Sequence, residues 1–153
     1  MENEPEYTHL WNGRIRKDHL RNELVGTLDE AMAFIGLAAN KTQDVNFLHE
    51  VVDDIGKVTS ICACDKIPAP VVDGGFIDGS IICWQKISNP TGFIKFRGEA
   101  ASYLNVARTK IRTAEIMAVT LYEKKELDVG VVTYLNKMSK LLFLVGAYYC
   151  QMN

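Results

Sequence analysis

The stretch VARTKIRTAE, residues 106–115, carries the side chains whose types and spacing most readily do chemistry. Arg108, Arg112 and Glu115 are four and three residues apart, so a helix would place all three on one face. That face also carries the neighbours of Leu104, which predicts that it points inward, where charges need a partner or a function. Two arginines one turn apart could hold a polyphosphate, because their donor forks suit phosphate. The alternative, a solvated face with an Arg112–Glu115 ion pair, is favoured by spacing alone.

Two other segments place polar groups among apolar ones. In GTLDE, residues 26–30, Asp29 falls near an apolar stripe beside small residues, which favours pairing with a cation. Arg108 is the candidate partner, and the alternative is a pair of surface acids. In YLNKMSKLLF, Asn136 and Ser139 lie one turn apart. A lone asparagine in a bundle helix is more often a local hydrogen bonder than a ligand group.

The four cysteines give only a weak metal signal. Cys62 and Cys64 form one C-x-C without a matching pair or a nearby histidine, so buried, unreactive thiols are predicted and no metal site is expected. The three histidines form no H-E-x-x-H pattern, and no G-x-x-x-x-G-K-[ST] phosphate loop occurs. GGFIDG is interpreted as a turn and not as a dinucleotide-binding fingerprint, because no helix is expected to follow it.

Length and composition favour one ordinary globular domain, residues 1–153. With 24% charged residues and a net charge of −2, the chain is not basic enough to suggest nucleic acid or a lipid surface. No apolar run reaches the roughly 18 residues that a membrane span needs. The start, MENEPEYTHL, is acidic and polar, which is unlike a signal peptide. Together with reduced cysteines, this predicts a cytoplasmic protein.

Helical periodicity recurs in four segments, and it predicts an all-α, up-and-down bundle of four or five helices. The segments are approximately Asn22–Asn40, Asp44–Ala63, Glu99–Lys125 and Val129–Cys150. Asp44 and Asp128 are candidate amino-terminal caps of the second and fourth segments.

The insertion between the second and third segments, residues 65–98, has a different composition. It holds three of the four prolines and many glycines. Within it, VVDGGFIDGSIICW is typical of a strand, a tight turn and a second strand, with Asp73-Gly74 or Asp78-Gly79 as the turn. The insertion is therefore predicted to be irregular with a β-hairpin.

Four blocks occur in a fixed order, LWNGRIRKDHLR, GTLDEAMAFIGLA, VARTKIRTAE and YLNKMSKLLF. Together they resemble the ATP:cob(I)alamin adenosyltransferases of the propanediol-utilisation (PduO) type. The resemblance covers residues 7–63 and 93–153, and the separation of Glu115 from Asn136 is what the family pattern requires. Four ordered blocks with that spacing are a far more specific signal than any one of them.

The resemblance implies a homotrimer of helical bundles with ATP, Mg²⁺ and cobalamin at the seams between subunits. In the family, cobalt reduced to Co(I) attacks the 5′ carbon of ATP, and triphosphate leaves. Four positions match nucleotide-contacting residues of the family: Lys17, Arg112, Glu115 and Asn136. Fixed cations aimed at the leaving triphosphate would stabilise its growing charge.

Three further positions follow from the same match. Arg108 and Asp29 match a salt bridge between subunits that shapes the site, and with Arg112 they are the predicted catalytic residues. Phe93 matches the aromatic residue that displaces the lower cobalt ligand, although it lies one residue closer to the arginine helix than the family pattern has it. An apolar residue under the corrin disfavours a water or base ligand, which makes Co(I) easier to reach.

The amino terminus departs from the family pattern. Family members open with a T-K-T-G-D-x-G-T-type segment whose backbone and lysine wrap the triphosphate, whereas this chain reads MENEPEY. Glu2, Glu4 and Glu6 stand there, and carboxylates repel a triphosphate.

Other departures lie in the helical blocks. Thr113 and Ile116 occupy positions where arginine is usual, and Lys140 stands where aspartate is common. The irregular insertion takes the place of a helix that the family has before its arginine helix. Three interpretations therefore stand: an active adenosyltransferase with an altered phosphate grip, a non-catalytic trimer that binds corrinoid, nucleotide or a protein partner, and a scaffold without ligands.

Overall fold

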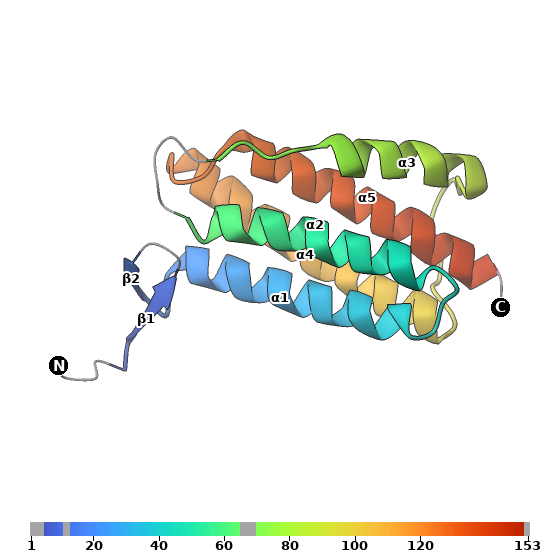
Figure 1. Ribbon diagram of the computed structural model, residues 1–153, viewed down its shortest axis with the longest axis horizontal. Coiled ribbons are helices and arrows are strands. Elements are labelled where there is room, and N and C mark those ends of the chain that lie inside the picture. Colours follow the sequence, from blue (N-terminus) through green and yellow to red (C-terminus); the bar gives the residue numbers. More distant parts are fainter. Residues whose placement is uncertain (1–4, 11–12, 65–69, 152–153) are drawn as a thin grey trace.

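The computed structural model describes residues 5–10, 13–64 and 70–151, which form five helices and a two-stranded hairpin (Figure 1). The strands are β1 (Tyr7–Leu10) and β2 (Gly13–Arg16), and the helices are α1 (Leu20–Ala39), α2 (Val45–Cys62), α3 (Gly75–Ile87), α4 (Glu99–Glu123) and α5 (Val129–Gln151). The strands pair antiparallel, with Tyr7 opposite Arg16. The four helices predicted from periodicity are confirmed, each to within two residues at either end.

The helices run side by side as a bundle (Figure 1). Helix α1 packs against α2 and α4, α4 packs against α5, and α3 packs against α5. Aromatic rings join α3 to both α2 and α5, since Trp84 lies 5.4 Å from the ring of Phe47 and 5.5 Å from that of Tyr148. Helix α3 therefore packs over the junction between α2 and α5.

The β-hairpin predicted in VVDGGFIDGSIICW is wrong, because this segment forms the start of α3. Its buried residues Ile77, Ile81 and Trp84 have helical spacing. The Asp-Gly signal starts the helix rather than turning a strand: the carboxylate of Asp73 accepts the backbone N–H of Gly75 at 2.9 Å. Interpreting GGFIDG as a turn was wrong for the same reason, and the helix before the arginine helix is present.

Two predicted caps and the predicted thiol burial have mixed outcomes. Asp128 accepts the backbone N–H of Gly130 at 2.8 Å at the start of α5, as predicted. Asp44 lies at the cap position of α2 but makes no cap bond there, and its carboxylate accepts the hydroxyl of Tyr149 instead. Cys62 is buried, whereas Cys83 is exposed, contrary to the prediction of buried thiols.

Helix α5 is long and apolar enough to span a membrane by length and composition. In the fold, however, 56% of its most apolar window is buried inside the bundle. Its apolarity is explained by its place in the core, where Leu135, Met138 and Leu142 are fully buried.

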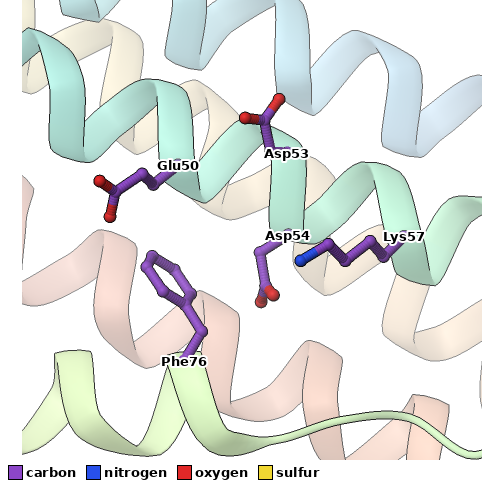
Figure 2. Close-up of a pocket in the computed structure, with 5 residues that line it drawn as sticks. All are labelled: Glu50, Asp53, Asp54, Lys57 and Phe76. Carbon is purple, nitrogen blue, oxygen red and sulfur yellow. The ribbon is translucent and has the colours of Figure 1, made fainter.

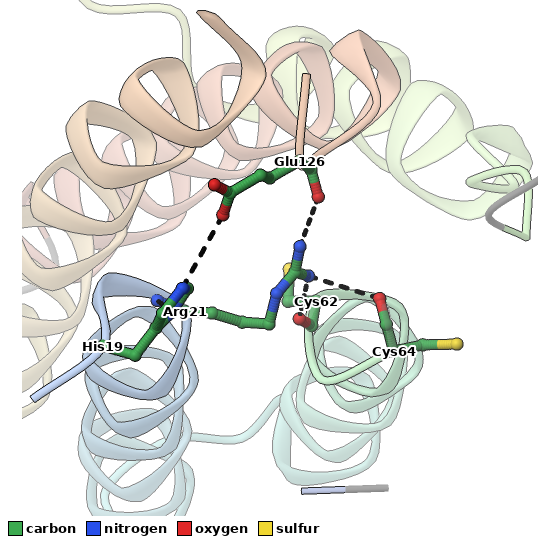
Figure 3. A network of polar contacts seen from close by, with 5 residues as sticks. All are labelled: His19, Arg21, Cys62, Cys64 and Glu126. Carbon is green, nitrogen blue, oxygen red and sulfur yellow. Dashed lines mark hydrogen bonds and ion pairs between the residues drawn. The ribbon is translucent and has the colours of Figure 1, made fainter. Parts of the chain in front are cut away.

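A buried arginine ties one end of the bundle together (Figure 3). Arg21, only 4% exposed, donates to the carbonyl oxygens of Cys62 at 2.6 Å and Cys64 at 3.2 Å, and to that of Glu126. These carbonyls lie at the end of α2 and in the turn after α4. His19 adds to the network: its Nδ1 accepts the backbone N–H of Arg21 at 3.0 Å, and its Nε2 lies 3.8 Å from the carboxylate of Glu126.

We predict that Arg21→Met lowers the free energy of unfolding by about 2–4 kcal/mol, because buried carbonyls at three places lose a charged donor. Urea denaturation measures the change. Arg16→Met is the matched control: Arg16 is half exposed and pairs with Asp18, so its loss should cost less than about 1 kcal/mol. Equal losses in the two variants would contradict the structural role of Arg21.

The thiol of Cys62 lies beside this network. Burial raises the pKa of Cys62 to about 12, and the nearby charge of Arg21 lowers it only in part. In the unfolded chain the same thiol ionises near its ordinary pKa of 9.0. The thiol therefore contributes stability that is complete below pH 9 and is lost as the pH rises towards 12.

We predict that the stability difference between wild type and Cys62→Ala shrinks above pH 9, by about 1.4 kcal/mol per pH unit. Urea denaturation of both proteins at pH 8, 9 and 10 measures this difference. Subtracting the free energy of unfolding of the variant from that of the wild type removes the contribution of all other titrating groups. Two profiles that stay parallel over this range would show that the thiol ionises equally in both states.

Candidate functional site

The arginine face of α4 lies beside the core rather than inside it. The buried stripe of this helix includes Ala107, Ile111 and Ala114. Arg108, one position further on, is half-buried, and Arg112 is exposed. The prediction that the face points inward is therefore wrong for Arg112, and the two guanidinium groups border an open surface.

Arg108 is held in place by neutral groups of its own chain. Its Nε and Nη2 donate to the side-chain oxygen of Asn105 at 3.0 and 2.9 Å. Its guanidinium carbon lies 5.8 Å from the ring centroid of Phe96. Burial, followed by the charge of Arg112, lowers the pKa of Arg108 from its ordinary value. Two adjacent cations repel each other and create a positive electrostatic potential, which favours the binding of an anion.

Glu115 and Asn136, whose separation in the sequence fits the family pattern, lie side by side in the structure. The side-chain amide of Asn136 on α5 donates to the carboxylate of Glu115 on α4 at 3.2 Å. The next residue, Lys137, pairs with Asp78 of α3 at 2.7 Å. The third and fourth motif blocks, which lie on α4 and α5, thus face each other across the α4–α5 seam.

The Asp29–Arg108 pair does not form within the described chain. Asp29 is exposed on α1, although the sequence placed it near the buried stripe, which instead contains Leu28 and Ala31. Its neighbour Glu30 makes the ion pair across the α1–α4 seam, with Lys110 at 2.6 Å. The carboxylate of Asp29 is left facing outward.

Lys17 lies at the junction of the hairpin and α1. Its backbone N–H donates to the carbonyl of Glu6 at 2.7 Å, and its carbonyl accepts the side-chain amide of Asn22 at 2.9 Å. Its side chain is exposed. Glu2 and Glu4, the first acids of the divergent amino terminus, lie outside the described residues.

Phe93 is 93% exposed in the segment between α3 and α4. Its ring therefore gains little from burial within the described chain. An exposed apolar row also runs along α4 beyond Arg112, formed by Ile116, Val119 and Tyr122.

Sequence reasoning missed Asn105 and Phe96, although Asn105 stands three residues before Arg108, a spacing that permits the observed contact.

A separate hollow of about 180 Å³ lies between α2 and α3 (Figure 2). Glu50, Asp53, Asp54, Lys57 and Phe76 line it. None of the residues predicted from the motifs is among these. Within the described part of the chain, no group of three or more His, Cys, Asp or Glu side chains could hold a metal ion.

Asp54, the buried one of the carboxylates that line this hollow, is already engaged. Asp54 is 7% exposed and accepts the hydroxyl of Tyr134 on α5 at 2.7 Å. Burial and this carboxylate raise the pKa of Tyr134 well above its usual range. The bond joins α2 to α5, so we assign Asp54 a structural role.

The fold and the α4–α5 motifs define a member of a known enzyme family. The cobalamin adenosyltransferase family model matches residues 4–149. The chain therefore belongs to the cobalamin adenosyltransferase family.

Individual relatives agree with this assignment. The corrinoid adenosyltransferase of Bacillus subtilis (strain 168) is 29% identical over 154 residues, covering 89% of this chain and 77% of the relative. A variant of the PduO-type adenosyltransferase from Lactobacillus reuteri, complexed with ATP, superposes with a TM-score of 0.83 at 18% identity, over 99% of this chain and 94% of that one. Another variant, complexed with cobalamin and ATP, gives a TM-score of 0.83 at 18% identity, over 99% and 90%. These structures share the fold of the chain.

Proposed function

We propose that the protein transfers the 5′-deoxyadenosyl group of ATP to the Co(I) of a corrinoid and releases triphosphate. The single observation that carries the proposal is the cluster on α4 and α5. Arg108 and Arg112 border an open surface, and the Glu115–Asn136 bond lies on the same helix pair. Family membership and the ATP and cobalamin complexes of structural relatives support the choice of ligands.

The reaction needs fixed positive charge and alignment. A cobalt–carbon bond forms as the bond between C5′ and the triphosphate oxygen breaks. Cobalt supplies the electron pair and goes formally from Co(I) to Co(III), while the leaving triphosphate takes the pair of the broken bond. The positive charges of Arg112 and Lys17 would stabilise the negative charge that develops on the leaving triphosphate, because both side chains would already be in place before the reaction. Holding cobalt and carbon in line would remove much of the entropic barrier.

The remaining residues take supporting roles in this proposal. Glu115 and Asn136, which bond to each other, would contact the nucleotide as one unit. Phe93 would lie under the corrin and exclude a lower ligand, consistent with its exposed ring. Mg²⁺ would arrive with ATP, bound mainly by phosphate oxygens as is usual for this ion.

We further propose that the site is completed in a homotrimer, in the cytoplasm. The exposed carboxylate of Asp29 would then pair with Arg108 of a neighbouring copy. The exposed row of Ile116, Val119 and Tyr122 beside Arg112 supports an interface on this face, since such a row is costly in water. The free cysteines and the use of ATP fit a cytoplasmic location.

We predict that purified protein with ATP, Mg²⁺ and chemically reduced cobalamin forms adenosylcobalamin, followed by its visible spectrum. Arg112→Ala should weaken ATP binding about 10- to 100-fold, because a charged donor to phosphate is lost. Lys86→Ala on α3 removes the same charge far from the arginine face and should leave ATP affinity unchanged.

Three outcomes separate the interpretations. Turnover supports the enzyme, and a spectral shift of cobalamin without turnover indicates a non-catalytic binder. No response to either ligand would leave only a scaffold. Unchanged ATP affinity in Arg112→Ala would remove this arginine from the site.

The subunit pairing can be tested by exchanging charges. We predict that Asp29→Arg and Arg108→Asp each dissociate the trimer or weaken it at least tenfold, because each places like charges together. The double variant should restore assembly, measured by analytical ultracentrifugation. Asp53→Arg, an equal charge change on an exposed position of α2, is the control. A monomeric wild type, or a double variant no better than either single one, would refute the pairing.

A further inference from the structure

The segment between α3 and α4 is anchored by one aromatic ring. Phe96 packs edge-on against Phe143 of α5, with ring centroids 5.9 Å apart at 74°. The ring occupies a notch that exists because residue 146 is glycine. A Cβ on Gly146 would lie 2.7 Å from Cε1 of Phe96, so any larger residue would push the ring out.

The backbone on both sides of Phe96 is also held. The thiol of Cys150, near the end of α5, donates to the carbonyl of Lys95 at 3.3 Å and accepts the backbone N–H of Arg97 at 3.4 Å. Three attachments to α5 therefore converge on residues 95–97: the ring in its notch and these two contacts of the thiol.

The same ring faces the arginine helix. The guanidinium of Arg108 lies 5.8 Å from its centroid, within the range of a cation–π contact. Phe93 is only three residues before Phe96, so the Cα atoms of the two residues cannot lie more than about 11 Å apart. The placement of Phe93 and that of Arg108 thus share one support.

We propose that Phe96 is a positioning residue, which sets the backbone that carries Phe93 and at the same time orients Arg108. This inference rests on the proposed function, because it assigns Phe93 to the corrinoid. It adds that the corrinoid side and the arginine side of the site are linked through one ring seated against Gly146.

A purely structural Phe96 would behave like any half-buried aromatic residue of the bundle. Its loss would lower stability without changing how a bound corrinoid is ligated. A positioning residue has a further signature: the fraction of bound cob(II)alamin that lacks its lower ligand falls, while ATP affinity changes little. The absorption spectrum of cob(II)alamin bound with ATP reports this fraction directly.

The experiment compares Phe96→Leu with Phe47→Leu, the same change in the separate aromatic cluster of α2 and α3. Gly146→Ala, which displaces the ring without altering it, is the second test, and Gly79→Ala on α3 is its control, because a Cβ there meets nothing within 4 Å. We expect Phe96→Leu and Gly146→Ala to lower the equilibrium for losing the lower ligand about tenfold, with ATP affinity within about twofold. Both controls should match wild type.

A ligand-free measurement keeps the inference independent of the proposed function. Amide hydrogen exchange of residues 92–98 should be at least about tenfold faster in Phe96→Leu and Gly146→Ala, and unchanged in the controls. If wild type binds neither ligand but exchange still rises selectively, the proposed function fails and the anchoring role of Phe96 stands. Unchanged exchange, or a spectrum that responds equally to Phe96→Leu and Phe47→Leu, would overturn the inference.

Discussion

The close packing of α4 between α1 and α5 is the constraint on which the candidate site depends. The buried stripe of α4 is built largely from alanines, among them Ala107, Ala114 and Ala118. Small side chains let the neighbouring helices approach closely, so that α4 is fixed on two sides and open on the third. Any residue just off the stripe stands at the border of core and solvent. Arg108 occupies such a border position, and Arg112 lies one turn further along the open side.

The two ends of this helix are tied down by different chemistry. At the carboxyl end, the buried guanidinium of Arg21 binds backbone carbonyls of α2 and of the turn after α4. At the amino end, the ring of Phe96 fills the notch at Gly146, close to Arg108. Carbonyls at a helix end carry partial negative charge, so they can accept a buried cation without a carboxylate. A helix held at both ends can present charges with little freedom to move, which is what electrostatic stabilisation requires.

Periodicity predicted the four long helices because each buries a stripe along many turns. It failed at α3, where the stripe of Ile77, Ile81 and Trp84 spans only two turns and the Asp-Gly pairs dominate the local pattern. The family resemblance assigned Glu115 and Asn136 to the same nucleotide without predicting a bond between them, and the structure shows that their side chains meet across two long helices. Burial of single polar residues was the least predictable feature, and Asp29 is exposed. A shift of one position along a helix moves a side chain from the core to the surface, as Leu28 and Asp29 show. Which of the two positions is buried depends on the neighbouring helices that the fold packs against them.

The charge on the open side of α4 bears on the proposed site, because this chain departs from the family pattern there. Thr113 and Ile116 replace arginines that the family pattern usually has, so the helix offers fewer cations to a polyphosphate. Within one described chain, neither remaining arginine is neutralised by a carboxylate: Arg108 is bound by the amide of Asn105, and Glu115 is engaged by Asn136. In the proposed trimer Arg108 would pair with Asp29 of a neighbouring copy, which leaves Arg112 as the cation for the polyphosphate. Neutral partners orient an arginine but leave its charge available to an anion. Ile116 in turn makes the same face of α4 more apolar. A neighbouring subunit that packs on an apolar face would exclude water from the arginines beside it. In such a dry environment each remaining positive charge attracts an anion more strongly.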